Sequence, residues 1–318
     1  MTTPLDAMTE FEFIAWLRAR APHVACVRVG IGDDSAVLDL QGRDCLVTAD
    51  SVVAGVHFDP QSTPAEKIGR KALARAVSDI AAMAGIPLAV VACVMLPHEY
   101  PAAEAQQMYE GMEKLARECG AAIVGGDITG GAAQLALAVT VIGCPGNTPP
   151  VLRSGARAGD RIFVTGRLGG SILGHHLEFS PRVREAQSLA RQVPLHAMID
   201  ISDGLAADLS HILEESRCGA VLRAHDIPIA TAAQSLATTS GRSPLEHALS
   251  DGEDYELLFT VAEADAMKVP RTLPGNVPVT DIGQIVAEPG LWLEETAGQR
   301  VSIDTALRNR GWLHKIRR

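Results

Sequence analysis

The stretch Cys-Pro-Gly-Asn-Thr-Pro-Pro, residues 144–150, is the clearest linker in the sequence. Proline and glycine at this density favour turns and interrupt helices and central strands. Strand and helix patterns alternate before this stretch, and the alternation restarts after it. In a chain of 318 residues the break predicts two α/β domains, one at residues 1–145 and one at residues 146–318.

The hydrophobic pattern on either side of the linker predicts the elements of each domain. In the first domain, helices are expected to open at the capping boxes Thr9-x-x-Glu12 and Thr63-x-x-Glu66, the second with Pro64 as its first residue. Its other expected elements are a helix at 102–119 and strands at 36–40, 44–49, 88–95, 121–124 and 134–142. The second domain is expected to contain strands at 161–165, 197–201, 255–261 and 277–286, helices at 170–177, 181–192 and 204–215, and a short helical C-terminus.

The charge balance and the cysteines exclude several classes of protein. With 28 basic and 38 acidic residues, the chain has a formal net charge of −10, which disfavours nucleic acid and anionic membranes as partners. Its cysteines form no C-x-x-C pair, which argues against zinc and redox motifs. The N-terminus does not resemble a signal peptide, and no apolar run is long enough to span a bilayer. We therefore expect a reduced, cytoplasmic protein.

Aspartate recurs beside glycine or serine where an expected strand ends or an expected helix begins. The segments are Gly-Ile-Gly-Asp33-Asp34-Ser, Thr48-Ala-Asp50-Ser, Ser78-Asp79, Gly125-Gly126-Asp127 and Asp200-Ile-Ser202-Asp203-Gly, with a further acidic segment at Asp251-Gly-Glu253-Asp254-Tyr-Glu. Glycine lets the backbone approach a phosphate closely, and carboxylates bind hard cations. The pattern indicates a site for phosphates and metal ions.

Convergence of these carboxylates would require cations. Two carboxylates about 4 Å apart repel by about 4 kcal/mol at an effective dielectric near 20. Mg²⁺ suits a set of oxygen ligands, and it prefers to share its shell with substrate phosphates rather than to sit in a cage of protein atoms. The aspartates therefore favour nucleotide chemistry, provided that the fold brings them together.

Each aspartate taken alone also has an ordinary structural interpretation. An aspartate beside glycine is commonly a turn residue or a helix cap, and Asp203 is well placed to be the N-cap of the helix that follows it. Asp79 differs because it lies inside an otherwise apolar helix, where an unpaired carboxylate is costly. Recurrence of the pattern along the chain favours the functional interpretation.

The standard nucleotide-binding and hydrolase motifs are missing. The sequence has no G-x-x-x-x-G-K-[ST], no H-R-D or D-F-G element, no H-E-x-x-H and no G-x-S-x-G. Gly30-x-Gly32 begins like a dinucleotide fingerprint, but the third glycine is absent and a strand pattern follows. A Rossmann fold is therefore rejected.

Taken in order, a series of segments resembles the thiamine-monophosphate kinase family. They are G-I-G-D-D-S-A-V (30–37), T-A-D-S-V-V-A-G-V-H-F (48–58), V-S-D-I-A-A-M-A-G (77–85), G-G-D (125–127), R-S-G-A (153–156), G-D-R-I-F-V-T-G (159–166), D-I-S-D-G-L (200–205) and D-G-E-D-Y-E-L (251–257). The resemblance runs from about residue 10 to the C-terminus. Several segments are shared with a wider superfamily that includes aminoimidazole ribonucleotide synthetase, selenophosphate synthetase and a hydrogenase-maturation protein.

The resemblance implies a fold, an assembly and a reaction. The fold would be α+β, of the two-domain aminoimidazole ribonucleotide synthetase-like type, with an α/β C-terminal domain. The N-terminal domains would pair in a homodimer and close their strands into a β-barrel. The reaction would convert ATP and thiamine monophosphate into ADP and thiamine diphosphate, with several Mg²⁺ ions; a requirement for K⁺ is left open.

The resemblance also implies roles for individual residues. Mg²⁺ would be held by Asp34, Thr48, Asp50, Asp79, Asp127, Asp200 and Asp203. ATP would be contacted by Gly125, Gly126, Arg153 and Ser202. Thiamine would be contacted by His57, Glu253 and Trp312. Without the resemblance, His57 and Trp312 have packing roles as alternatives, and the pair His175-His176 is interpreted as structural.

The charge of the acceptor predicts the mechanism. A phosphate monoester has a second pKa of about 6, so its oxygen is already anionic near neutral pH. We therefore expect no general base, and direct in-line transfer without a phospho-enzyme. Catalysis would consist of positioning and charge neutralisation.

Some positions depart from the usual family pattern. They are Ala49, Ala76, Ile128, Gly130 and Asp251, and the stretch between Gly170 and Pro181 is shorter than usual. These changes leave the acidic positions intact, so ATP and Mg²⁺ are implied more firmly than thiamine. Two alternatives stay open: another ATP-dependent member of the superfamily with a different small substrate, and a non-catalytic paralogue that binds nucleotide or metal.

Overall fold

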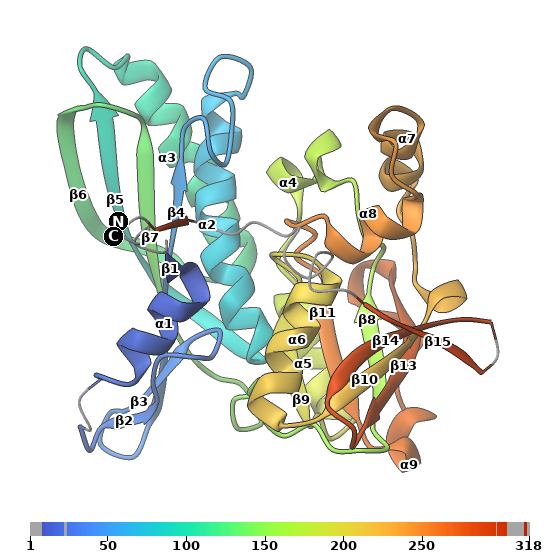
Figure 1. Cartoon of the computed structure of the whole chain (residues 1–318). Coiled ribbons are helices and arrows are strands. Elements are labelled where there is room, and N and C mark those ends of the chain that lie inside the picture. Colours follow the sequence, from blue (N-terminus) through green and yellow to red (C-terminus); the bar gives the residue numbers. More distant parts are fainter. Residues whose placement is uncertain (1–7, 22–23, 297, 304–314, 317–318) are drawn as a thin grey trace, which may run out of the picture.

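The structure, a computed structural model, describes residues 8–21, 24–296, 298–303 and 315–316. Two units, each built around a sheet, lie side by side (Figure 1). A short antiparallel pair, β1 (Met8–Thr9) with β16 (Lys315–Ile316), joins the two ends of the described chain.

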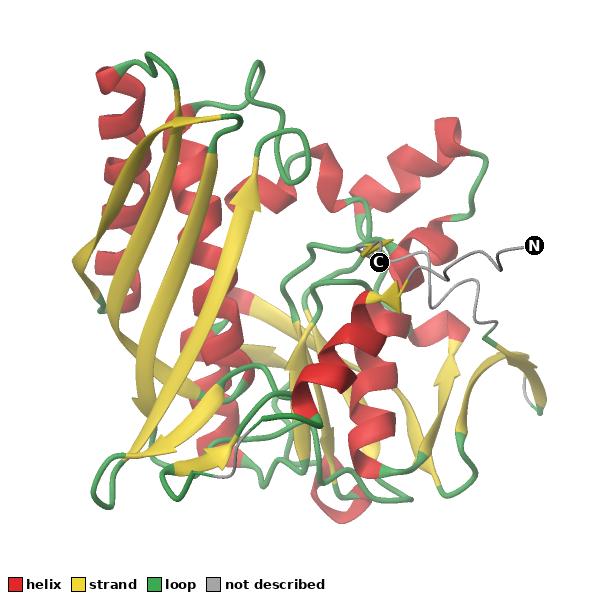
Figure 2. Cartoon of the chain, turned by 60° about the vertical axis from the view of Figure 1, so that its left-hand side comes forward, coloured by secondary structure: helices red, strands yellow, loops and turns green. Residues whose placement is uncertain are grey.

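The first unit is a six-stranded sheet with helices on one face (Figure 2). Its strand order is β2-β3-β4-β7-β5-β6, and only β5 and β6 run parallel. The strands are β2 (Val27–Val29), β3 (Ala36–Asp39), β4 (Asp44–Val53), β5 (Gly85–Pro97), β6 (Ala122–Ala132) and β7 (Ala136–Pro145). Helices α2 (Ala65–Ala82) and α3 (Ala102–Cys119) cover this face, whereas α1 (Glu10–Arg18) precedes β2 and its Arg18 pairs with Glu215 of the second unit.

Helices α2 and α3 pack against each other through glycines. A Cβ atom on Gly69 would lie 1.8 Å from the carbonyl oxygen of Met108, and one on Gly111 would lie 2.0 Å from that of Glu66. The two backbones can approach this closely only because both glycines lack a side chain. This contact fixes α2, which carries Asp79, over the sheet.

The edge strand β6 leaves apolar side chains uncovered. Val124 is 64% exposed and Ile128 is 74% exposed. Within the described residues of one chain, β6 pairs only with β5, so its outer edge is open and the sheet is not a closed barrel. An open edge with apolar neighbours is a surface that proteins usually cover.

The second unit is an eight-stranded mixed sheet. Its main order is β15-β14-β10-β13-β8-β11-β9, with β12 paired to β13. The strands are β8 (Arg161–Thr165), β9 (Ala197–Asp200), β10 (Gly219–Arg223), β11 (Leu257–Val261), β12 (Thr272–Leu273), β13 (Val277–Val286), β14 (Gly290–Thr296) and β15 (Gln299–Ser302). The α-helices are α4 (His175–Glu178), α5 (Val183–Gln192), α6 (Leu205–Ser216), α7 (Thr231–Ser240), α8 (Pro244–Ser250) and α9 (Glu263–Ala266).

The central strands of this sheet are buried on both faces. In β8, Ile162 and Val164 join the core beneath α6, whereas Phe163 joins the core beneath α5. Alternate residues of a strand point to opposite faces, so α5 and α6 cover opposite sides of the sheet. The consecutive apolar residues of β8 follow from this double burial.

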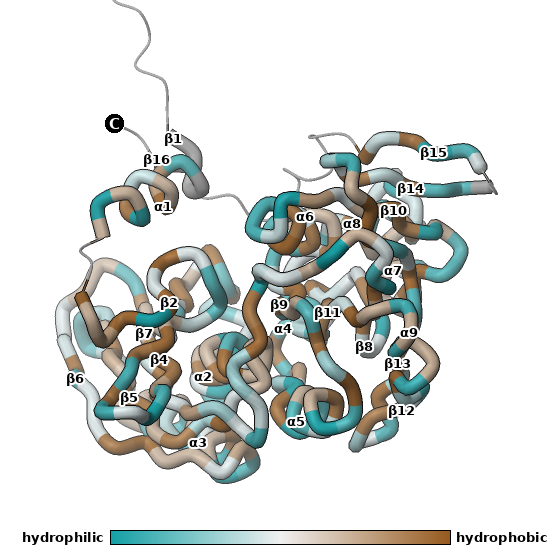
Figure 3. The backbone as a smooth tube through the Cα atoms, turned by 90° about the horizontal axis from the view of Figure 1, so that it is seen from below, coloured by the Kyte–Doolittle hydropathy of each residue, from teal (hydrophilic) through white to brown (hydrophobic). Residues whose placement is uncertain are grey.

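Helix α2 lies between the two units. It contacts β4 and β7 of the first sheet, and also α4, α5 and β9 of the second unit (Figure 3). Residues on its face toward the second unit therefore lie at the junction, where Asp79 meets the end of β9.

Two helices differ from their expected bounds. The helix expected from Thr63 begins at Ala65, and Pro64 is its N-cap in an extended conformation without a side-chain cap. The preceding turn is instead organised by Asp59, which accepts hydrogen bonds from Ser62 Oγ and Gln61 N.

The glycines in the shortened stretch interrupt the helix expected at 170–177. A 3₁₀ turn (Ser171–Leu173) and the short α4 replace it, because Gly170 and Gly174 adopt φ values of 76° and 131°. Strands β10, β14 and β15 and helices α7 and α8 were not expected. The expected helical C-terminus and Trp312 lie outside the described residues.

No helix in the described part of the chain combines the length and the apolar character needed to cross a membrane.

Candidate active site

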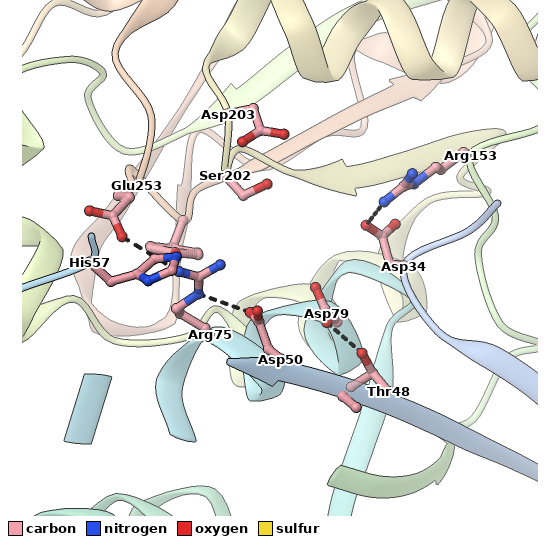
Figure 4. A pocket seen from close by; sticks show the side chains of 12 residues that line it. Asp34, Thr48, Asp50, His57, Arg75, Asp79, Arg153, Ser202, Asp203 and Glu253 are labelled. Carbon is pink, nitrogen blue, oxygen red and sulfur yellow. Dashed lines mark hydrogen bonds and ion pairs between the residues drawn. The ribbon is translucent and has the colours of Figure 1, made fainter. Parts of the chain in front are cut away.

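A cavity of about 290 Å³ opens where the two units meet, and most of the predicted site residues line it (Figure 4). These are Asp34, Thr48, Asp50, His57, Asp79, Arg153, Ser202, Asp203 and Glu253. Ala49, Arg75 and Tyr255 line it as well. The fold thus gathers side chains from Asp34 to Tyr255, which are 221 positions apart in the sequence.

Three carboxylates converge at one end of this cavity, where Asp34 and Asp79 line the wall and Asp200 is buried next to them. One oxygen each of Asp34, Asp79 and Asp200 lies within 4.8 Å of the others. Asp79 reaches them from α2 and Asp200 from the end of β9. Two of the carboxylates accept hydrogen bonds from hydroxyls. Thr48 Oγ1 donates to Asp79 at 2.6 Å, and Ser78 Oγ donates to Asp200 at 2.5 Å.

The proximity of these carboxylates opposes their ionisation. Burial, with repulsion from Asp200 and Asp50, raises the pKa of Asp79 well above its usual value. Burial, with repulsion from Asp34, raises the pKa of Asp200 to about 7. A compensating cation would remove this penalty, because it would favour the charged form of each carboxylate.

The donor set fits a divalent cation. Asp34 Oδ2 is buried and, within the described structure, has no hydrogen-bond partner. The three carboxylates offer only oxygen ligands, which suit Mg²⁺. A second group, Asp203, Asp208 and His211, has ligand atoms equally close together at the start of α6.

Arg153 closes the acidic end of the cavity. Its Nη2 atom donates to Asp34 at 2.7 Å, and its backbone N–H donates to the carboxylate of Asp33. Burial, with repulsion from Asp34, raises the pKa of Asp33 to about 7. The two carboxylates therefore have different roles. Asp33 accepts from the backbone N–H of Arg153, and Asp34 faces the cavity.

Asp203 is not a helix cap, contrary to its simplest structural interpretation. Gly204 is the N-cap of α6, and no side chain caps this helix. Asp208 Oδ2 instead accepts hydrogen bonds from Asp203 N and Gly204 N, each at 3.0 Å. The turn that carries Ser202 and Asp203 is thus held from inside the helix, by a residue that sequence reasoning did not single out.

The acidic segment at 251–257 contributes one carboxylate to the cavity. Glu253 lines the cavity, whereas Asp254 accepts from Gly169 N and Asp251 pairs with Arg242. Glu253 and Tyr255 have φ values of 65° and 49°, a strained region for residues with side chains. Hydrogen bonds from Glu253 N to Ser202 O and from Tyr255 N to Ile201 O, each 2.7 Å, hold this conformation.

His57 faces the cavity with a defined tautomer. Its Nδ1 atom accepts a hydrogen bond from Val53 N at 3.0 Å, so the ring proton of the neutral form is on Nε2. Lys71 Nζ donates to the backbone oxygen of His57 at 2.6 Å and pairs with Glu253 at 2.7 Å. This buried lysine therefore ties together the two described residues that the family resemblance assigns to thiamine.

Two cations on α2 were missed by sequence reasoning. Lys71, Arg75 and Asp79 are four residues apart, so they lie on one face of the helix. Arg75 Nε donates to Asp50 Oδ2 at 2.9 Å. Asp50 is therefore paired with an arginine, and it is not part of the three-carboxylate group. The four-residue spacing of Lys71, Arg75 and Asp79 is visible in the sequence and could have identified this charged face of α2.

The glycine-rich segment at 125–127 lies elsewhere in the chain. Gly125, Gly126 and Asp127 line a separate, largely apolar cavity of about 600 Å³ over β5, β6 and α3. They are part of β6, which runs through them, rather than following a strand that ends at residue 124. One chain alone does not bring Asp127 to the three-carboxylate group.

Comparisons with known proteins agree with this arrangement. Residues 32–144 match the family "AIR synthase related protein, N-terminal domain", and residues 123–294 match the corresponding C-terminal domain. A thiamine-monophosphate kinase of Rhodopirellula baltica is 43% identical over 291 residues, which cover 89% of this chain and 91% of the relative. The chain belongs to the thiamine-monophosphate kinase family. This family consists of phosphotransferases, and the recognition made from the sequence motifs is confirmed.

Other members of the thiamine-monophosphate kinase family match over most of their length. The enzyme of Bacillus subtilis is 33% identical over 301 residues, which cover 87% of this chain and 91% of the relative. The solved structure named "AaThiL complexed with AMPPCP and TMP" superposes with a TM-score of 0.80 at 26% identity, covering 96% of this chain and all of that one. The expected pair of synthetase-like domains with mixed α/β content is thus confirmed.

Proposed function

We propose that this protein transfers the γ-phosphoryl group of ATP to thiamine monophosphate, which yields ADP and thiamine diphosphate. The observation that carries the proposal is the convergence of the buried Asp200 with Asp34 and Asp79, two carboxylates that line the cavity at the junction of the units. The names of the relatives state the reaction, and the solved neighbour is named as a complex with an ATP analogue and TMP. Mutual repulsion among these acids makes a purely structural role unfavourable.

Asp34, Asp79, Asp200 and Asp203 would hold Mg²⁺ in this proposal. Bound Mg²⁺ would offset the negative charge of the triphosphate and of the acceptor phosphate. Thr48 keeps one oxygen of Asp79 oriented, and Ser78 does the same for Asp200. Asp208 holds the turn of Ser202 and Asp203 in place.

Thiamine would occupy the end of the cavity formed by His57, Glu253 and Tyr255. Because His57 Nδ1 already accepts a backbone hydrogen bond, this ring presents Nε2–H and acts as a donor rather than a base. Glu253 supplies a carboxylate from a strained loop whose position is fixed by Ser202. A contact from Trp312 stays a prediction.

The acceptor needs no protein base, because its phosphate is already anionic near neutral pH. The residues of the cavity would instead bind, orient and exclude water, with Arg153 holding phosphate oxygens beside Asp34. Direct in-line transfer follows from this division of roles. No side chain would carry the phosphoryl group between the substrates.

ATP would also require the cavity over β6. This cavity is large and largely apolar, which suits an adenine ring. Gly125 leaves open space for a phosphate, whereas Gly126 allows the backbone to pack against the carbonyl oxygen of Ala92. It lies away from the three-carboxylate group of the same chain. We therefore infer a homodimer in which the open edges of β6 meet, the two sheets close into a barrel, and Asp127 of each chain completes the site of its partner.

We propose residues 1–145 and 146–318 as the two domains, because β7 ends at Pro145 and β8 begins only at Arg161. A cytoplasmic location stays a prediction, and a requirement for K⁺ stays open.

Product analysis tests the proposed function. Purified protein incubated with ATP, Mg²⁺ and thiamine monophosphate should form thiamine diphosphate, and the Asp79→Asn variant should not. Formation of ADP with another phosphorylated acceptor, but not with this one, would favour a different superfamily activity. Nucleotide binding without any product would favour a non-catalytic paralogue.

A further inference from the structure

We propose that Arg75 binds the phosphate group of the acceptor substrate and that Asp50 is its counter-ion. The inference rests on the proposed function, because it concerns the acceptor of that reaction. The ion pair adds a role for Asp50 to the metal ligation implied by family resemblance and does not replace it.

The position of Arg75 follows from helix geometry. Residues four apart on α2 rise by about 6 Å along one face. Arg75 therefore lies one turn from Asp79 at the acidic end and one turn from Lys71 beside His57 and Glu253. This places its guanidinium between the proposed metal site and the proposed thiamine site (Figure 4).

The hydrogen bonding of Arg75 leaves its capacity only partly used. Nε donates to Asp50, whereas Nη1 is 3.9 Å from Glu253 Oε1, too far for a hydrogen bond. Its side chain is 17% exposed and lines the cavity, but that of Lys71 is fully buried. A guanidinium has five donors in a planar fork that matches a phosphate, so Arg75 can bind one without leaving Asp50.

The charges of the cavity favour a phosphate at this position. Arg75 and Arg153 are the arginines on the described wall of the cavity, and Arg153 is held at the acidic end by Asp33 and Asp34. The acceptor carries a phosphate dianion, which the carboxylates at that end repel. Arg75 offers the attractive charge nearer to the thiamine end. The acceptor would thus be oriented with its phosphate toward the metal site.

A purely structural role makes a different prediction. If Arg75 only neutralised Asp50, its loss would weaken every ligand of the cavity alike, or would lower stability alone. If Arg75 binds phosphate, its loss affects phosphorylated ligands selectively. Comparison of thiamine monophosphate with thiamine, which lacks the phosphate, separates these roles.

Calorimetric titration of the full-length protein with Mg²⁺ and each of the two ligands tests the proposal. In Arg75→Met, we expect affinity for thiamine monophosphate to fall about 10- to 100-fold, with affinity for thiamine nearly unchanged. Arg75→Lys keeps the charge and should recover part of the loss. Arg161→Met is the matched control, because Arg161 pairs with Asp281 in a similarly buried position outside the cavity.

The outcomes distinguish this proposal from the proposed function. Equal losses for both ligands, or no loss, would overturn the role of Arg75 even if the wild-type protein makes thiamine diphosphate. Wild-type protein that binds the two ligands equally would overturn it as well. A selective loss in a protein that makes no thiamine diphosphate would support the phosphate site and reject the proposed kinase reaction. Thermal melting of Arg75→Met and Arg75→Lys identifies misfolding, and a folded Arg75→Lys still permits the comparison.

Discussion

At the scale of single residues, the site combines carboxylates that repel with hydroxyls and arginines that hold them in place. Asp79 and Asp200 approach each other although burial opposes their charged forms. Thr48 and Ser78 orient them without neutralising them. This arrangement lowers the stability of the metal-free folded protein, and bound cations would offset the repulsion.

Replacing Asp79 with Asn should separate activity from stability. We expect kcat to fall by at least about 100-fold, because an amide is a poor substitute for a charged metal ligand. The metal-free variant should melt at the same temperature as the wild type or higher, because a repelling acid is gone. Product formation and thermal melting measure the two effects. Glu263→Gln, at an exposed position of α9, is the control and should change neither.

The stability of the metal-free protein should depend on pH in a defined direction. The pKa of Asp200 is raised from 3.8 to about 7 by burial and by repulsion from Asp34. Between these values the folded protein binds more protons than the unfolded chain, so stability falls as pH rises from about 4 to about 7. Each pKa unit corresponds to about 1.4 kcal/mol.

Thermal melting at pH 5.5 and pH 8 checks this direction. We expect the metal-free protein to melt at a lower temperature at pH 8 and Mg²⁺ to restore the loss there. Asp200→Asn should reduce the dependence on pH. A melting temperature that rises over this range and ignores Mg²⁺ would contradict the assignment.

At the scale of elements, α2 carries the site because α3 holds it close. The approach of the two helices depends on Gly69 and Gly111, which leave no room for a side chain. Movement of α2 would displace Lys71, Arg75 and Asp79 together. Packing of the first unit and geometry of the site are therefore linked through one helix pair.

Gly69→Ala should destabilise the protein although alanine favours helices. The added Cβ atom would collide with the backbone of Met108, which cannot move as a side chain can. Overpacking of this kind costs about 1–3 kcal/mol. The midpoint of urea unfolding should fall accordingly. Gly30→Ala, where a Cβ atom would make only an ordinary contact of 3.6 Å with Val27 Cγ1, is the control; equal effects of both substitutions would argue against the close contact.

The elements also show what the sequence could predict. The helix at 102–119 and the strand at 161–165 have the expected bounds, because the left-handed Gly120 ends the former and apolar residues mark the latter. The strand through Gly125-Gly126-Asp127 was missed, because glycines suggest a turn while pairing with β5 keeps them extended. The family resemblance assigned Asp34, Asp79 and Asp200 to one metal site. It did not identify Arg75, because the role of this residue depends on the orientation of α2.

At the scale of the whole molecule, one chain holds the parts of the site in two places. The three-carboxylate group lies at the junction of the units, whereas Asp127 is part of β6, the strand with the open edge. The proposed homodimer would bring these parts together across chains.

A dimer that depends on β6 should be sensitive to charge at its exposed apolar positions. Ile128→Asp would place a carboxylate in the proposed interface, where burial of an unpaired charge is unfavourable. Light scattering should show monomers, and activity should be lost although each monomer retains Asp34, Asp79 and Asp200. Met267→Asp, at a 93% exposed position in the second unit, is the control. An active monomer would contradict the shared site.

Mixing two inactive variants tests the shared site directly. In a heterodimer of Asp79→Asn and Asp127→Asn chains, one site would combine the intact Asp79 of one chain with the intact Asp127 of the other. Co-refolded mixtures should therefore regain about a quarter of wild-type activity, because half of the dimers are mixed and each has one complete site of two. Absence of any recovery would place Asp127 in the site of its own chain.

The most direct test of the central claim follows the γ-phosphate through one turnover. Protein in excess over γ-³²P-labelled ATP is mixed with Mg²⁺ and thiamine monophosphate and is quenched in acid at short times. We expect label in thiamine diphosphate at the rate at which ATP disappears, no label on the protein, and no transfer in the Asp79→Asn variant. Label that stays on the protein, or transfer that survives loss of Asp79, would contradict this expectation.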